Sequence, residues 1–177
     1  MLANALTLSR LTLAPILVVA VVRESHLAAS AIFFLAVATD VADGNVARRL
    51  GVASPRGAFF DHVVDAIFCS AGTAALAYAG ALPAILPPLI ALAFLQYALD
   101  SRIMSVRGLR ASVLGRWNGI AYYAIVAIPI VRDALGLAWP DGFWVTMLGW
   151  GLVLTTVASM LDRARLLFRN RSSRVAS

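Results

Sequence analysis

Four aspartates recur at helical spacing in a chain that is otherwise strongly apolar. They are Asp40, Asp43, Asp61 and Asp65, in the pattern D-x-x-D-G-x-x-A-R, eight residues, then G-x-x-x-D-x-x-x-D. Side chains three or four positions apart share a helix face, so each of two helices would present a pair of carboxylates. Oxygen ligands without Cys favour Mg²⁺ or Mn²⁺ over zinc. The pattern therefore predicts a site for two divalent ions.

The apolar setting strengthens this interpretation. A charge deep in a bilayer costs on the order of 2.5–3.5 kcal/mol, so four bare carboxylates would cost about 10 kcal/mol or more. Bound ions would cancel that charge. A cation path through a small transporter is the alternative use of such a cluster. That alternative gives no reason for the small residues Gly44, Ala47 and Gly57 beside the aspartates, which leave room for a nucleotide.

The complete pattern resembles the signature of the CDP-alcohol phosphatidyltransferase family. The resemblance holds at all eight positions, which are Asp40, Asp43, Gly44, Ala47, Arg48, Gly57, Asp61 and Asp65. It implies a membrane bundle of six helices, often dimeric, that uses two Mg²⁺ or Mn²⁺ ions. It also implies transfer of a phosphatidyl group from CDP-diacylglycerol to an alcohol, with release of CMP.

The resemblance further implies a role for each residue of the pattern. The four aspartates would bind the ions, and Asp65 would also act as the catalytic base. The CDP group would be bound by Asp43, Gly44, Ala47, Arg48 and Gly57. His62 adjoins Asp61 but lies about 100° further round the helix, so we expect it to pack beside the site.

The acceptor alcohol is less well defined by the sequence. Asn4, Leu6, Thr7, Arg10 and Pro15 form N-x-L-T-x-x-R-x-x-x-x-P, which resembles phosphatidylglycerophosphate synthases and favours glycerol 3-phosphate. Those synthases commonly carry Lys directly after the fourth aspartate, where this chain has Ala66. Inositol phosphate, phosphatidylglycerol, serine and a soluble CDP-alcohol donor remain the alternatives.

Four arginines near the predicted end of the fourth helix could bind a phosphate on the acceptor. They are Arg102, Arg107, Arg110 and Arg116. The planar guanidinium matches phosphate oxygens in pairs, which makes such a cluster suitable for this ligand. Arg102 is the first candidate because Asp100 and Ser101 make its helix end unusually polar.

Composition predicts the elements that must position these groups. The chain has 177 residues, a mean hydropathy of +0.84 and 14% charged residues, which indicates an integral membrane protein. Apolar runs separated by polar breaks predict six helices in one domain, 1–177, with a disordered basic tail at 168–177. The predicted helices are 5–22, 27–48, 57–80, 84–104, 117–136 and 142–166.

The charge distribution predicts the orientation. All fifteen basic residues are Arg, for a net charge of +6. With a cytoplasmic N-terminus, thirteen arginines would lie on the cytoplasmic side, and only Arg23 and Arg132 on the other. This bias predicts that both termini and the site face the cytoplasm of a bacterial inner membrane. Because the arginines lie at the ends of apolar runs, we expect no nucleic-acid partner.

This topology gives a first testable prediction. Reporter fusions after residue 80 and after residue 110 should report opposite sides of the membrane, because one predicted span separates them. Reporter activity on the two sides measures this directly. Two fusions on the same side would contradict the predicted number of helices.

Overall fold

The computed structural model describes residues 2–49, 55–103 and 113–175. Within these ranges the chain forms six α-helices and no strand, which confirms the all-helical class. The helices are α1 (Leu2–Val22), α2 (His26–Arg49), α3 (Pro55–Tyr78), α4 (Leu86–Ile103), α5 (Val113–Ala134) and α6 (Gly142–Val175).

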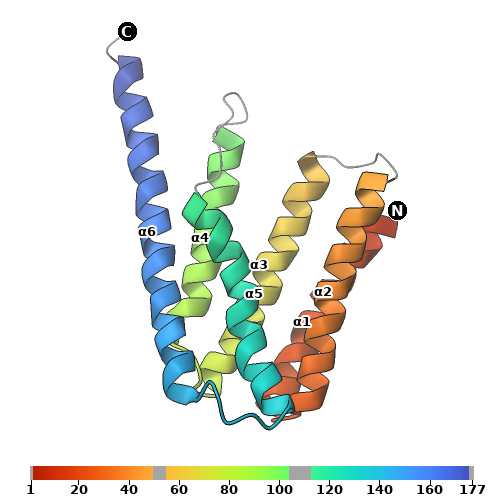
Figure 1. The fold of residues 1–177 in the computed structure, drawn as a ribbon. Helices are drawn as coiled ribbons and strands as arrows, with labels where there is room; N and C mark the ends of the chain where they lie inside the picture. Colours follow the sequence, from red (N-terminus) through yellow and green to blue (C-terminus); the bar gives the residue numbers. More distant parts are fainter. Residues whose placement is uncertain (1, 50–54, 104–112, 176–177) are drawn as a thin grey trace.

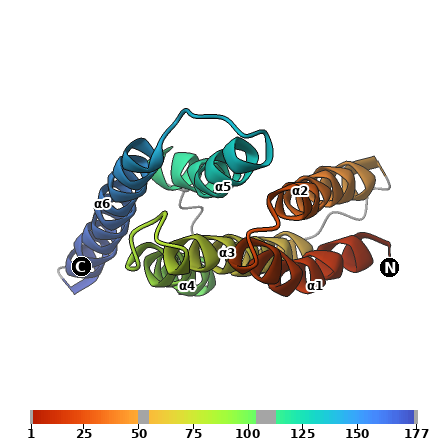
Figure 2. The same cartoon turned by 90° about the horizontal axis from the view of Figure 1, so that it is seen from below.

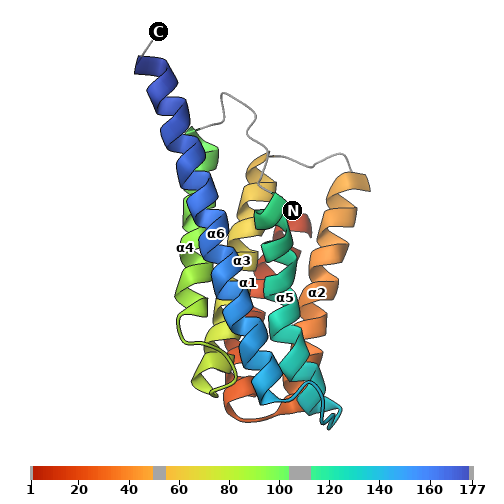
Figure 3. The same ribbon diagram turned by 60° about the vertical axis from the view of Figure 1, so that its left-hand side comes forward.

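The six helices form two rows of three (Figures 1 and 2). One row contains α4, α3 and α1, and the other contains α6, α5 and α2, with packing both along and between the rows. Both termini lie at the same end of the bundle, where α6 extends beyond the other helices (Figures 1 and 3). An even number of helices running alternately up and down produces this arrangement.

α1 packs against both α2 and α3, and those two helices make little direct contact with each other in the described residues. The short link between α2 and α3 would lead one to expect close antiparallel neighbours. That expectation is wrong, because the N-terminal helix occupies the position beside both. A side chain of α1 can therefore contact residues of both α2 and α3.

The core runs along the faces that the helices turn toward each other. Leu17 of α1, Phe33 of α2, Phe68 of α3 and Val126 of α5 are almost completely buried. Gly72 lets α3 and α5 approach closely, since a Cβ there would lie 3.0 Å from a methyl group of Val126. Many large apolar side chains remain exposed on the outside, as expected for a surface in contact with lipid.

The three connections at the end opposite the termini all begin with the same kind of helix cap. Glu24, Gly80 and Gly136 each have a positive φ, of 54°, 78° and 63°, and each lies two residues beyond the end of α1, α3 or α5. In each case the next residue donates its N–H to a carbonyl five positions back, for example Ala81 to Leu76 at 2.9 Å. This left-handed cap ends a helix sharply and suits glycine best.

Two helix ends differ most from the predicted ones, and the others differ by at most three residues. α5 begins at Val113 rather than 117, so the polar stretch around Arg116 forms its first turns. α6 continues to Val175 and includes most of the basic segment expected to be disordered. Neither Gly nor Pro interrupts residues 152–175, and Leu and Arg are good helix formers, so nothing in the sequence stops α6 earlier.

Length and apolar composition allow three of the described helices to cross a membrane. These segments are Phe59–Tyr78, Leu114–Ala134 and Gly142–Arg165. Three shorter apolar segments accompany them, namely Leu8–Val22, His26–Ala42 and Leu86–Ala98. Together with the outward apolar side chains, they indicate an integral membrane protein.

The contact between α6 and the α3–α4 turn yields a stability prediction. A Cβ on Gly149 would lie 2.6 Å from Cδ of Pro83, whereas a Cβ on Gly151 would meet nothing within 4 Å. Because the proline ring is rigid, Gly149→Ala should lower the free energy of unfolding by about 1–3 kcal/mol.

Gly151→Ala is the matched control in the same helix. It should leave the stability unchanged or raise it by up to about 1 kcal/mol, since Ala favours helix over Gly. Thermal unfolding of both variants in detergent measures the difference. Equal unfolding temperatures of the two variants would show that the close approach of Gly149 to Pro83 does not contribute to stability.

Candidate functional site

Three of the four predicted aspartates lie on the inward faces of their helices. Asp40 follows the buried Ala36 and Phe33 on α2, at helical spacing. Asp61 and Asp65 lie on the face of α3 that also carries Phe68. Apolar packing of these faces therefore brings carboxylates from two helices toward the middle of the bundle.

Arg10 of α1 joins these carboxylates. Its side chain is wholly buried, and its Nη1 lies 2.6 Å from Oδ1 of Asp40. The same nitrogen donates to Oδ1 of Asp65, and Nη2 donates to Oδ1 of Asp61. We call Asp40, Asp61 and Asp65 the carboxylate cluster. One guanidinium thus contacts three carboxylates from two helices.

Charge balance explains why this arrangement is stable. The carboxylates are between a fifth and a third exposed, while Arg10 is fully enclosed. Breaking a buried ion pair by removing one partner costs about 3–5 kcal/mol, since the other charge is then left unpaired. Arg10 offsets one of the three negative charges, so the cluster retains an excess of two when its members are ionised.

Asp65 has a further partner. The hydroxyl of Tyr123 on α5 donates to Oδ1 of Asp65 at 2.7 Å. The ring of Tyr123 stacks on Phe68, one turn further along α3. Asp65 is therefore held from two sides, by α1 and by α5, which fixes the orientation of its carboxyl group.

His62 lies nearer to the acidic side chains than its position on the helix predicts. Asp61, His62 and Asp65 each offer one ligand atom, and these atoms lie within 4.8 Å of one another. The ring of His62 also packs edge-on against Phe94 of α4. The packing role expected for His62 thus coexists with a geometry that could hold an ion.

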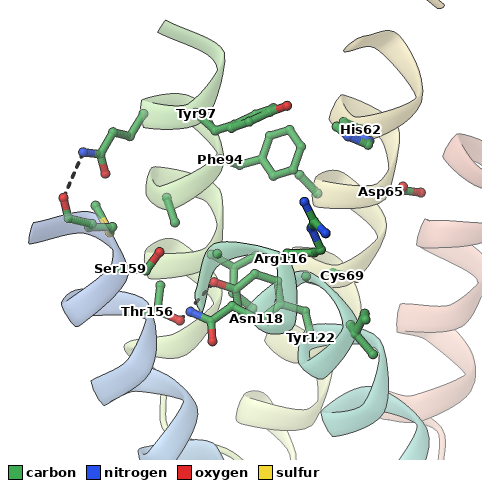
Figure 4. A pocket seen from close by; sticks show the side chains of 18 of the residues that line it. His62, Asp65, Cys69, Phe94, Tyr97, Arg116, Asn118, Tyr122, Thr156 and Ser159 are labelled. Carbon is green, nitrogen blue, oxygen red and sulfur yellow. Dashed lines mark hydrogen bonds between the residues drawn. The ribbon is translucent and has the colours of Figure 1, made fainter. Parts of the chain in front are cut away.

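A cavity of about 490 Å³ opens beside the carboxylate cluster, between α3, α4, α5 and α6. Asp40 and Asp65 form part of its wall, and Figure 4 shows the side chains that face it from the other helices. We call this the acceptor-side cavity. Its polar lining, besides the two aspartates, includes His62, Gln96, Tyr97, Arg116, Asn118, Tyr122, Thr156, Ser159 and Arg163.

Two amides in this lining have unused hydrogen-bonding atoms. Asn118 is 5% exposed, and within the described part of the chain its Nδ2 has no partner. Gln96 donates from Nε2 to the carbonyl of Met160 at 3.1 Å, while its buried Oε1 accepts from no described residue. Buried polar atoms are normally paired, so a donor and an acceptor left over in one cavity indicate a polar ligand.

Arginines lie near these amides. Arg116 is exposed and lines the cavity from the first turns of α5. Among the described residues, no carboxylate forms an ion pair with it. Arg163 of α6 lies over the ring of Tyr97, 4.9 Å from its centroid, in a cation–π contact. The cavity therefore offers positive charge opposite the acidic wall.

For the other predicted site residues, the structure describes the helix at most and not the contacts of the side chain. Arg107 and Arg110 lie outside the described residues. Arg102 belongs to α4 and Gly57 to the first turn of α3, where Gly57 is exposed. Asp43, Gly44, Ala47 and Arg48 belong to α2, but their side chains lie outside the described residues.

The sequence did not assign three residues to the places that they occupy at the carboxylate cluster and the cavity. Arg10 stands at the start of an apolar run, where a charge needs a partner. The sequence thus indicates that Arg10 is paired, but it does not show with which residue. Tyr123 and Asn118 are polar residues within the apolar α5, and each could have been flagged for the same reason. Only the packing of α5 against α3 identifies what they face.

Comparison with known proteins adds independent information. Residues 1–163 match the family model of the CDP-alcohol phosphatidyltransferases. A probable phosphatidylglycerophosphate synthase of Mycobacterium tuberculosis, found in two strains, is 30% identical over 168 residues, covering 91% of this chain and 78% of the relative. A CDP-diacylglycerol–glycerol-3-phosphate 3-phosphatidyltransferase of Pseudomonas fluorescens is 43% identical over 65 residues, covering 35% of this chain and 33% of the relative. No solved structure matches significantly.

Proposed function

The chain belongs to the CDP-alcohol phosphatidyltransferase family, and we propose that it transfers the phosphatidyl group of CDP-diacylglycerol to glycerol 3-phosphate. The names of the relatives from M. tuberculosis and P. fluorescens support this acceptor. The reaction would release CMP and serve phospholipid synthesis. One observation carries the proposal, namely that a single cavity reaches from Asp65 to the cationic and amide groups of α5.

The carboxylate cluster fits a divalent-ion site. Its members supply oxygen ligands from two helices, and one guanidinium leaves their negative charge in excess. This donor set suits Mg²⁺ or Mn²⁺. We propose that Asp40, Asp43, Asp61 and Asp65 hold two such ions. When bound, they would neutralise the charge of the diphosphate and of the leaving CMP.

The residues of the chain would perform the remaining steps. Asp65 would accept the proton of the acceptor hydroxyl, which then bonds to the phosphorus attached to the lipid glycerol as the bond to CMP breaks. Tyr123 and Arg10 hold the carboxyl group of Asp65 in place. Arg48 would bind the diphosphate, beside Gly44, Ala47 and Gly57, which give the nucleotide access to the backbone.

The acceptor-side cavity supports a small phosphorylated alcohol. Arg116 would bind the phosphate, to which Asn118 can donate from its unpaired Nδ2. The unpaired Oε1 of Gln96 can accept from a hydroxyl. Glycerol 3-phosphate carries both kinds of group, with one end anionic and the other able to reach Asp65.

Ala66, where similar synthases carry Lys, also lines this cavity. The methyl group is nearly buried, and it leaves space that a long basic side chain would fill. Arg116 and Arg163 line the same cavity from α5 and α6 and can supply positive charge instead. The departure at Ala66 is thus compatible with a phosphorylated acceptor.

We propose further that the chain spans the bacterial cytoplasmic membrane six times. The common end at which both termini lie supports this, as does the large excess of arginine assigned to that side (Figures 1 and 3). The carboxylate cluster and the cavity would then open toward the cytoplasm, where glycerol phosphate is available.

Metal dependence is the first test of this function. Chelator should abolish transfer from CDP-diacylglycerol, and Mg²⁺ or Mn²⁺ should restore it. Mutating an outer partner of a metal ligand costs about 10- to 100-fold, so the loss of a ligand in Asp40→Asn, Asp43→Asn or Asp61→Asn should cost at least as much. CMP release by the purified protein measures all of these effects.

Asp133→Asn is the control, because Asp133 pairs with Arg132 at the opposite end of the bundle. It should keep near-normal turnover and metal dependence. Full activity of the unaltered protein in chelator would contradict the proposed ions.

The acceptor site gives a second test. A hydrogen bond to a charged group contributes about 1.5–3 kcal/mol, so Arg116→Ala should raise the acceptor KM roughly tenfold to a hundredfold. The donor KM should change little, because other residues hold the diphosphate. Arg116→Lys should recover part of the loss, since it keeps the charge without the planar fork.

Arg165→Ala is the matched control, since Arg165 is an exposed arginine of α6 that does not line the cavity. The variants Arg102→Ala, Arg107→Ala and Arg110→Ala complete the set. If all four Ala variants of the predicted acceptor arginines keep the normal acceptor KM, these residues serve topology alone and glycerol 3-phosphate is the wrong acceptor.

A further inference from the structure

Arg10 is the most unusual charged residue of the described chain. It is the largest side chain that is almost wholly buried, and it lies on the same face of α1 as Ala14 and Leu17. All three of its ionic partners, Asp40, Asp61 and Asp65, are residues assigned above to metal binding. A side chain placed in this way must affect how ions bind.

The contacts of Arg10 differ from those expected of a residue that binds the acceptor. Its occurrence in the N-terminal pattern is typical of synthases with a phosphorylated acceptor. Arg10 does not, however, line the acceptor-side cavity, and it has no exposed surface with which to meet a substrate. Its terminal nitrogens contact carboxylates instead.

The guanidinium and a divalent ion would bind the same three carboxylates. Arg10 contacts one oxygen, Oδ1, of each of the three carboxylates. Oδ1 of Asp65 already accepts from both Arg10 and Tyr123. An ion bound at these oxygens would also lie within a few ångströms of a positive charge enclosed by protein, where repulsion is weakly screened.

We propose that Arg10 is a resident counter-cation that competes with divalent ions for Asp40, Asp61 and Asp65. It holds α1, α2 and α3 together at the carboxylate cluster and lowers the affinity of the cluster for ions. Arg10 is a positioning residue in this scheme, because it acts through the ligands and not on the substrate. The inference rests on the proposed metal site.

Metal affinity provides the decisive test. Mn²⁺ is titrated into the purified protein in detergent, and the free ion is measured by electron paramagnetic resonance. Ligands at coupled sites typically alter each other's affinity by about 5- to 150-fold, and a tethered cation at the ion site itself should have an effect at least as large as the lower value. Arg10→Gln should therefore bind Mn²⁺ at least about fivefold more tightly than the unaltered protein, and Arg10→Lys, which keeps the charge, should change less.

Arg132→Gln is the matched control. Arg132 also pairs with an aspartate, Asp133, but does so at the other end of the bundle. Its Mn²⁺ affinity should equal that of the unaltered protein. Equal or weaker Mn²⁺ binding by Arg10→Gln would overturn the competition and leave Arg10 as a structural ion pair.

Thermal stability gives a readout independent of affinity. In chelator, Arg10→Gln should unfold about 6 °C or more below the unaltered protein, since three carboxylates lose their common partner. Saturating Mn²⁺ should restore most of that loss, because ions then replace the missing charge. An equal loss in chelator and in Mn²⁺ would contradict the proposal.

Arg10→Gln could also fail to accumulate. The proposal then requires that expression and purification with Mn²⁺ throughout recover folded protein, and failure under both conditions overturns it. A wild-type protein that binds no Mn²⁺ would refute the metal site itself. Wild-type binding together with an unchanged Arg10→Gln affinity would refute only the role of Arg10.

Discussion

The ion-pair cluster around Arg10 is the interaction on which the site depends. A guanidinium without exposed surface inside an apolar bundle would be very costly alone, and the three carboxylates around it remove most of that cost. Because the partners come from α2 and α3, the pairing requires α1 to lie beside both helices. The position of α1 is thus an electrostatic requirement as well as a matter of packing.

The first three helices and the last three then contribute to two neighbouring chemical environments. α1, α2 and α3 bring the carboxylates and Arg10 together, while α4, α5 and α6 complete the cavity beside them (Figures 2 and 4). Asp65 belongs to both environments, since it pairs with Arg10 and also lines the cavity. A transfer reaction needs such a group between the donor and the acceptor.

Hydropathy predicts the six helices well because apolar runs and left-handed caps mark their ends. Gly80 and Gly136 are visible in the sequence, and α1 through α4 differ from their predicted bounds by a few residues. Helical spacing also places Asp61 and Asp65 on one face. The spacing of two aspartates within one helix, however, does not show which other helices pack beside them. The contact of Asp40, Asp61 and Asp65 with Arg10 of α1 was therefore not predictable. The early start of α5 was hidden by Gly115, which favours a break locally but is tolerated within the helix.

The order of the residues along the chain has a consequence for synthesis in the cell. Arg10, Asp40, Asp61 and Asp65 all precede α4, so a ribosome that has finished α3 has already produced every member of the ion-pair cluster. Before α2 and α3 are in place, Arg10 lacks these three carboxylate partners. If these helices span a membrane, we therefore expect the release of α1 from the insertion machinery to be favoured once α2 and α3 have entered. The first half of the protein would then assemble as an ion-paired unit, against which α4, α5 and α6 dock.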